Sequence, residues 1–181
     1  MADDNETFIM LLLSDSNLPT GAFVASSGLE SYIKHGFNYN DADRTLMTFI
    51  RSNLTSYAHT ALPFVSDTHR WASPMNAGSD IDAVLKQIRA LDDLYHAMTP
   101  NHVTRRASES QGVALLTLYS KGFSEPKATH AAPSNGAMAV SVLIDRYKLL
   151  IRREEAHGHL PICWGILTGA LGLSLGRQPF L

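Results

Sequence analysis

The 181-residue sequence predicts an all-α fold, a single globular bundle of about seven or eight helices. The spacing of apolar residues is helical almost throughout, and we find no convincing strand pattern, heptad run or internal repeat. Hydrophobic residues make up 45% of the chain and charged residues 18%, a composition that supplies a sizeable core and excludes a disordered chain. A loop insertion at about 124–136 does not separate two complete cores, so we expect one domain over residues 1–181.

The first part of the chain is predicted to hold two short helices around a tight corner. The apolar segment from Phe8 to Leu13 ends in polar residues. Leu18-Pro19-Thr20-Gly21 forms a turn, because proline restricts the residue before it and glycine interrupts regular structure. The segment from Ser27 to Glu30 fits a capping box that opens a helix to about Lys34.

A longer helical pattern follows this corner. Asn40 or Asp41 caps a helix, and Pro63 then either starts a new helix or kinks this one before Trp71. One face of the pattern is apolar, at Leu46, Phe49, Ile50, Leu54 and Tyr57. A stripe of this kind is typical of an amphipathic helix.

The clearest amphipathic pattern begins at Ser79 or Asp80, either of which caps it, and ends near Met98. Asp82 and Lys86 form an i, i+4 pair on its outer side. The next helix begins at Asn101, and a further one resumes near Ala137 after the loop insertion. Small residues on the helix after Asn101, Gly112 among them, would let a neighbouring helix approach closely.

The uncharged run from Leu160 to Leu175 is predicted to form a buried helix. It is shorter than the ~20 residues that a membrane-spanning helix needs, so a membrane-associated hairpin is the weaker interpretation. A helix that is apolar all round is normally covered by a core or a partner. Three glycines in this run, spaced i, i+4 and i+7, are interpreted as helix-packing residues: Gly165, Gly169 and Gly172.

Charge and cysteine content exclude several classes of protein. The net charge of −2 gives no global electrostatic reason to bind nucleic acid or an anionic membrane. The acidic start, Met1 to Glu6, lacks the positive charge of a secretory signal, which favours a cytoplasmic protein. The single cysteine, Cys163, excludes an internal disulfide and a multi-cysteine zinc site. No nucleophile elbow, Walker A loop or dinucleotide-binding glycine motif is present, so no catalytic residue is predicted.

His157 and His159, followed by Cys163, are weak candidates for metal ligands. A helix that starts after His159 would place His159 and Cys163 on one face, and imidazole with thiolate suits nickel, zinc or copper. The simpler interpretation is a polar turn between helices with a buried, inert thiol, and the spacing suggests no fourth ligand. The alternative function that these residues leave open is a small α-helical metal-dependent enzyme using His157, His159 and either Glu154 or Glu155.

Three segments of the sequence resemble the urease accessory protein UreF family. The segment from Ser14 to Phe23, followed by Ser27 to Glu30, is similar to the opening signature of that family. The segment from Arg105 to Leu116 resembles the family's central helix, and the segment from His159 to Gly172 resembles a later one. Together they cover about residues 7–176. The resemblance marks these residues as motif or partner-binding positions: Asp15, Pro19, Thr20, Gly21, Phe23, Glu30, Arg106, Gln111 and His159.

The resemblance implies a non-catalytic accessory protein that assists nickel insertion into apo-urease. In that family the protein bridges the UreD (or UreH) scaffold and the GTPase UreG, so nickel is handled by the partner complex and no intrinsic cofactor is expected. Self-association with a second copy of the chain is a further partner expectation. The Asp15 corner and Glu30 are expected to act as one functional unit.

The end of the sequence departs from the family pattern. Family members continue past the late segment into further helices and a tail, whereas this sequence ends at Gly176 to Leu181. The chain therefore resembles a C-terminally short member in which those helices are missing. The apolar stripes they would cover are expected to make this chain poorly soluble or self-associating.

Overall fold

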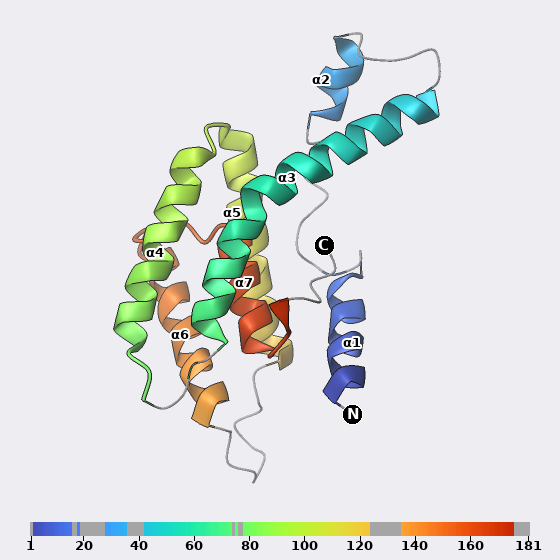
Figure 1. Cartoon of the computed structure of the whole chain (residues 1–181). Helices are drawn as coiled ribbons and strands as arrows, with labels where there is room; N and C mark the ends of the chain where they lie inside the picture. The colour runs from blue at the N-terminus through green and yellow to red at the C-terminus, as the bar shows by residue number, and fades with distance from the viewer. Residues whose placement is uncertain are drawn as a thin grey trace.

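The computed structural model describes residues 2–15, 18, 28–35, 42–73, 75, 78–123 and 135–175. Over these residues the chain forms helices and no strand, which confirms the all-α prediction. Figure 1 shows the arrangement of the helices in space. In chain order they are α1 (Ala2–Leu13), α2 (Leu29–Lys34), α3 (Ala42–Ala72), α4 (Ile81–Met98), α5 (His102–Leu118), a π-helical turn η2 (Tyr119–Phe123), α6 (Asn135–Arg152) and α7 (Leu160–Ala170).

Helix α7 lies at the centre of the bundle. It packs along the second part of α3 and along α5, with α4 and α6 completing the surround. Since α7 is apolar on every side, burial on all sides is the arrangement that stabilises it. In the described part of the chain, no helix combines the length and apolarity that a membrane crossing requires. The fully or almost fully buried side chains of the core are Ile88, Leu115, Leu116, Leu143, Ile144, Tyr147, Ile162, Ile166 and Leu167.

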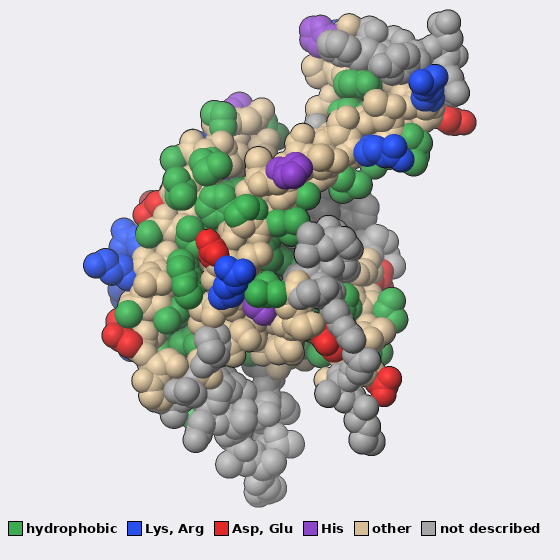
Figure 2. All heavy atoms as spheres, in the orientation of Figure 1, with side chains coloured by type: hydrophobic (Ala, Val, Ile, Leu, Met, Phe, Trp, Pro, Cys, Tyr) green, Lys and Arg blue, Asp and Glu red, His purple; other side chains and the backbone are tan. Residues whose placement is uncertain are grey.

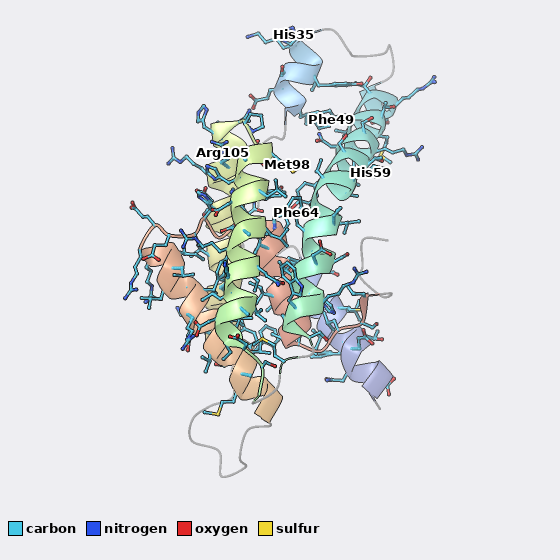
Figure 3. The ribbon with its side chains drawn as sticks, turned by 60° about the vertical axis from the view of Figure 1, so that its left-hand side comes forward. His35, Phe49, His59, Phe64, Met98 and Arg105 are labelled. Atoms are coloured by element: carbon cyan, nitrogen blue, oxygen red, sulfur yellow. The ribbon has the colours of Figure 1, made fainter. Side chains whose placement is uncertain are left out.

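Helix α3 is one continuous helix with Pro63 inside it, so the kink rather than a new helix is what the structure shows. Its first part projects from the bundle, and its direction changes where it joins the other helices (Figure 1). We call residues 43–60 the arm, and residues 61–72 of α3 together with α4–α7 the body. Figure 3 shows Phe49 and His59 on the arm and Phe64 at the level of the body. Helix α2 lies beside the arm, where the rings of Tyr32 and Phe49 are 5.1 Å apart.

Side-chain caps start two of the helices as predicted. The Asp80 carboxylate accepts hydrogen bonds from two backbone N–H groups of the first turn of α4, each at 3.1 Å. Asn101 caps α5 in the same way. Asp82, expected to pair with Lys86, instead bonds Arg146 of α6 at 2.6 Å. The outer side of α4 is therefore tied to α6.

The capping box predicted for α2 is wrong. The N-cap of α2 is Gly28, which has a φ of 91° and provides no side-chain hydrogen bond. Ser27, expected to cap this helix, lies outside the described residues. A left-handed backbone conformation favours glycine, which explains why the chain has this residue at the cap position.

Two glycines let α7 approach α3 closely. A Cβ atom added at Gly165 would collide with the Thr68 side chain, and one added at Gly169 would lie 2.8 Å from Ala72 Cβ. Gly112 has a similar role on α5, where an added Cβ would collide with the Gly158 carbonyl oxygen. Any side chain at these positions would push the helix or turn away from its neighbour.

The interpretation of Gly172 as a helix-packing residue is wrong. Gly172 lies beyond the end of α7 with a φ of 69°, and an added Cβ would meet no atom within 4 Å. Its N–H donates to the Gly169 carbonyl at 3.1 Å, and the Leu173 N–H donates to the Thr168 carbonyl at 3.0 Å. This pair of hydrogen bonds is a Schellman motif, so Gly172 ends the helix instead of packing it.

Candidate functional site

Three histidines and a glutamate gather where α4, α5 and the turn before α7 meet. His96 is in the last turn of α4, Glu109 is on α5, and His157 and His159 belong to the turn. One nitrogen or oxygen ligand atom from each residue lies within 4.8 Å of those of the others. His96 Nδ1 is 3.1 Å from His159 Nε2 and 3.4 Å from Glu109 Oε1, and His159 Nε2 is 3.8 Å from the same oxygen. We call these four residues the histidine cluster.

Buried Asp92 of α4 fixes the turn that carries two of these histidines. Its carboxylate accepts hydrogen bonds from the backbone N–H groups of His157 at 2.7 Å, Gly158 at 2.8 Å and His159 at 3.1 Å. Three N–H donors can hold a buried carboxylate, which would otherwise be costly to remove from water. Gly158 has a φ of 77°, which bends the chain around this acceptor. The position of both histidine backbones therefore depends on one acid from another helix.

His159 is completely buried and its ring is held from both sides. Its Nδ1 lies 3.2 Å from the Ser108 Oγ atom, and that oxygen also accepts the Leu160 N–H at 3.0 Å. Burial lowers the pKa of His159 to about 4, and burial also lowers the pKa of His96. Both imidazoles are therefore neutral at neutral pH, which is the form that binds metal ions.

His157 stacks on His96 and is only partly buried. The two ring centroids are 3.7 Å apart and the ring planes are inclined by 14°. His157 Nε2 lies 3.4 Å from Asp93 Oδ1, and its Nδ1 lies 4.0 Å from Glu109 Oε1. The ring is therefore held between acids of two different helices.

Cys163 does not belong to the histidine cluster, so its pairing with His159 as a metal ligand is wrong. Its Sγ atom donates to the Gly158 carbonyl at 3.4 Å. The thiol is buried, and burial raises its pKa well above the usual range. Helix α7 does begin after His159, but the cysteine side chain faces the turn backbone instead of the ring.

A hollow of about 580 Å³ opens beside the cluster and shares two of its residues, Glu109 and His157. Arg106 and Glu154, both named from the sequence, also line this hollow. Gln111 is half-buried on the same helix. Arg106 and Glu154 thus line one hollow although they are far apart in the chain, whereas His159 is buried in the cluster beside it.

The other motif residues lie elsewhere. Asp15 is exposed just after α1, and its carbonyl accepts the Leu18 N–H at 3.1 Å. Glu30 is exposed on α2. Helix α2 lies along the arm whereas the end of α1 lies beside the body, so this arrangement does not join them in one site (Figure 1). Four residues of the corner lie outside the described residues: Pro19, Thr20, Gly21 and Phe23.

The sequence did not point to His96 and Glu109, because each is the isolated residue of its type on an otherwise ordinary amphipathic helix. Nor did it point to Asp92, which was interpreted only as part of α4. The available signal was weak: a charged residue, Asp92, falls among the apolar positions Ile88, Leu91 and Tyr95 of the buried side. A buried acid on an apolar helix face implies a partner with several donors.

The fold and the site together define an all-α binding protein. Its two candidate binding features are the projecting first part of α3 and the histidine cluster. A model of the UreF family matches residues 39–177. The chain belongs to the UreF family, which confirms the resemblance of its motifs.

Named relatives extend over nearly the whole chain. "Urease accessory protein 6" of Cryptococcus neoformans is 36% identical over 95% of this chain and 65% of the relative. The "Uncharacterized urease accessory protein UreF-like" of Schizosaccharomyces pombe is 31% identical over 97% of this chain and 65% of that protein. "Urease accessory protein UreF" of Corynebacterium glutamicum is 26% identical over 97% of this chain and 65% of the relative. The chain thus spans 65% of the length of each of these relatives, and no solved structure matches it.

Proposed function

We propose that this chain is a non-catalytic accessory protein of urease maturation. In this role it acts in the cytoplasm with a UreD or UreH scaffold and the GTPase UreG, and it helps deliver nickel to apo-urease. The observation that carries the proposal is the family match over residues 39–177, together with relatives named as urease accessory proteins. GTP hydrolysis and assembly of the nickel centre belong to the partners, and nickel is cargo of the complex.

The arm provides a surface of the kind that such a role needs. It exposes five large apolar side chains on adjacent turns, with exposed fractions from 40% to 60%: Leu46, Met47, Ile50, Leu54 and Tyr57. Figure 2 shows hydrophobic side chains on the projecting arm as well as over α3 and α4 of the body. A continuous apolar stripe on a projecting helix is typical of a protein-binding surface, because its contact with water is unfavourable.

Capture by the partners tests this proposal. The full chain, tagged, is mixed with UreD and UreG homologues from the same organism, and co-purification of both is expected. The variant Met47→Glu with Leu54→Glu should lower capture by at least about tenfold, because two charges would be buried in the interface. Ser52→Glu, an exposed position on the same arm, is the matched control and should bind like the parent. Equal capture by all three chains would contradict the assignment of the arm.

Urease activation in cells that lack their own family member gives a functional readout. The Cryptococcus neoformans relative is the positive control, and full activation is expected in cells that express it. Glu30→Ala should lower activation while leaving the helical circular dichroism unchanged, because Glu30 is exposed. A large loss of melting temperature with unchanged partner binding would instead assign Glu30 to stability alone.

The second candidate is the small metal-dependent enzyme, which the histidine cluster beside the hollow favours. In that case the purified chain would turn over a substrate with its metal and without partners. Hydrolysis that is lost in Glu154→Gln would support it, since Glu154 lines the hollow next to His157. Metal binding without turnover favours the accessory role.

A further inference from the structure

We propose that His96, His159 and Glu109 form a binding site for one late first-row divalent metal ion, with a further coordination position open to the adjacent hollow. This inference stands on the geometry of the histidine cluster and is independent of the urease role. It assigns ligands from three separate segments of the chain, two of which the sequence did not indicate.

The separations of the three ligand atoms fit a common metal ion. His96 Nδ1, His159 Nε2 and Glu109 Oε1 form a triangle with sides of 3.1, 3.4 and 3.8 Å. The point equidistant from its corners lies about 2.0 Å from each atom, against about 2.0–2.2 Å for zinc bonds to imidazole nitrogen and carboxylate oxygen. An ion slightly to one side of this plane would therefore bind all three without a shift of the backbone.

The side chain of His159 is oriented before any ion arrives. The Ser108 hydroxyl oxygen lies at hydrogen-bond distance from Nδ1, so Nδ1–H can donate to it and leave the Nε2 lone pair facing His96 and Glu109. A hydrogen bond on the second ring nitrogen is the usual arrangement for a metal-binding histidine. Asp92 fixes the backbone of the same residue through its N–H. Both contacts reduce the ordering cost of binding.

The other two ligands are accessible to an incoming ion. The side chains of His96 and Glu109 are 28% and 31% exposed. Glu109 also lines the hollow, so the hollow gives solvent access to one ligand of the site, while His159 is completely buried.

His157 is not a ligand in this arrangement. Its ring is stacked on His96, with centroids 3.7 Å apart and planes inclined by only 14°. Imidazole lone pairs lie in the plane of the ring, so those of the two histidines lie in separate, nearly parallel planes and do not meet at one ion. His157 could bind the same ion only after its ring turned away from His96. The open position therefore faces the hollow, as in metal sites with two histidines and one carboxylate.

The ligand chemistry selects the class of ion. Two imidazoles with one carboxylate suit nickel, zinc, copper and iron, whereas calcium and magnesium prefer oxygen ligands throughout. Without a thiolate the site has no special preference for soft ions, because Cys163 bonds the Gly158 carbonyl instead. Ni²⁺ and Zn²⁺ are therefore the probes of choice.

Titration of the metal-free full chain with Ni²⁺, and separately Zn²⁺, by calorimetry tests the proposal. About one ion per chain is expected, and His96→Gln and Glu109→Gln should each weaken binding by at least about tenfold. His102→Gln is the matched control, because His102 is an exposed histidine at the start of the same helix as Glu109. Each variant is compared with the parent by circular dichroism. Absence of binding, or equal loss in the His102→Gln control, would overturn the proposal.

A spectroscopic measurement keeps the test decisive if a variant unfolds. The parent chain and Cys163→Ser, loaded with Co²⁺, should show the same absorption bands and no thiolate-to-metal charge-transfer band. A charge-transfer band that disappears in Cys163→Ser would overturn the ligand set, since the metal would then be bound by sulfur.

Discussion

The two parts of α3 carry similar apolar patterns but have opposite environments. In residues 61–72, Phe64 and Val65 are each 6% exposed and Ala72 is completely buried, because α7 lies along them. In the arm, Met47 and Leu54 are each 60% exposed. Apolar periodicity thus shows which face of a helix is more stable when buried, but not whether another part of this chain buries it. The difference separates a part of α3 that stabilises the fold from a part that is available to a partner.

The sharpest test of this comparison is one apolar truncation in each part of α3. Phe64→Ala should lower the free energy of unfolding by about 3–5 kcal/mol, because it opens a cavity beside Tyr95, whose ring lies 5.1 Å away. Leu54→Ala should change it by no more than about 0.5 kcal/mol, as is usual at exposed positions. Urea unfolding followed by circular dichroism measures both. Similar losses for the two variants would show that the arm is covered in solution.

Among the polar residues of the body, Asp92 is the one whose substitution should lower the free energy of unfolding most. Asp92→Asn removes the charge that three backbone N–H groups share and should cost about 1–3 kcal/mol. The neighbouring Asp93 side chain is 55% exposed, so Asp93→Asn serves as its control and should cost less than about 1 kcal/mol. Chemical unfolding of both variants decides whether the turn depends on the buried acid.

Close helix contact in the body is tested at a glycine. Gly165→Ala should destabilise the chain by roughly 1–3 kcal/mol, because the new methyl group would collide with Thr68 and with the Val65 carbonyl. Gly122→Ala adds the same methyl group in open space and should leave the midpoint of thermal unfolding near that of the parent. Equal melting temperatures for the two variants would show that α7 is less tightly held than the structure indicates.

The smallest expected effect is a pH dependence of stability from His69, which lies in the buried part of α3. Burial lowers the pKa of His69, so the unfolded chain binds a proton more readily than the folded chain. Stability should therefore fall as the pH drops below about 6.5, the ordinary value for the unfolded imidazole. His96 and His159 act in the same direction, so His69→Gln should reduce the slope without removing it. His59→Gln on the exposed arm is the control and should keep the parental slope.

Much of the fold follows from the sequence because its signals are local. Asp80 and Asn101 cap the helices that their sequence positions predict, and the helix after His159 begins where the run without charges begins. The signals failed where a residue's role depends on backbone conformation. Gly172 has the spacing of a packing glycine, but a positive φ beyond the end of α7 makes it a terminating residue.

Only half of the histidine cluster could be predicted. His157 and His159 are only two residues apart in the sequence, whereas His96 and Glu109 join them only because Asp92 holds the turn and Gly112 lets it approach α5. These are long-range contacts between single residues, and no local pattern encodes them. The exposure of the arm likewise depends on which other helices lie against it, and the apolar pattern of α3 does not contain that information.

Hydrogen–deuterium exchange of the full chain, alone and with the UreD homologue proposed as its partner, tests most directly whether the arm is the partner surface and the body the scaffold. In the free chain, amides of α7 should exchange more slowly than those of residues 43–60, because α7 is buried on all sides. Addition of the partner should slow exchange in residues 43–60 and leave α7 unchanged. Unchanged exchange in the arm, with new protection confined to the body, would contradict this assignment.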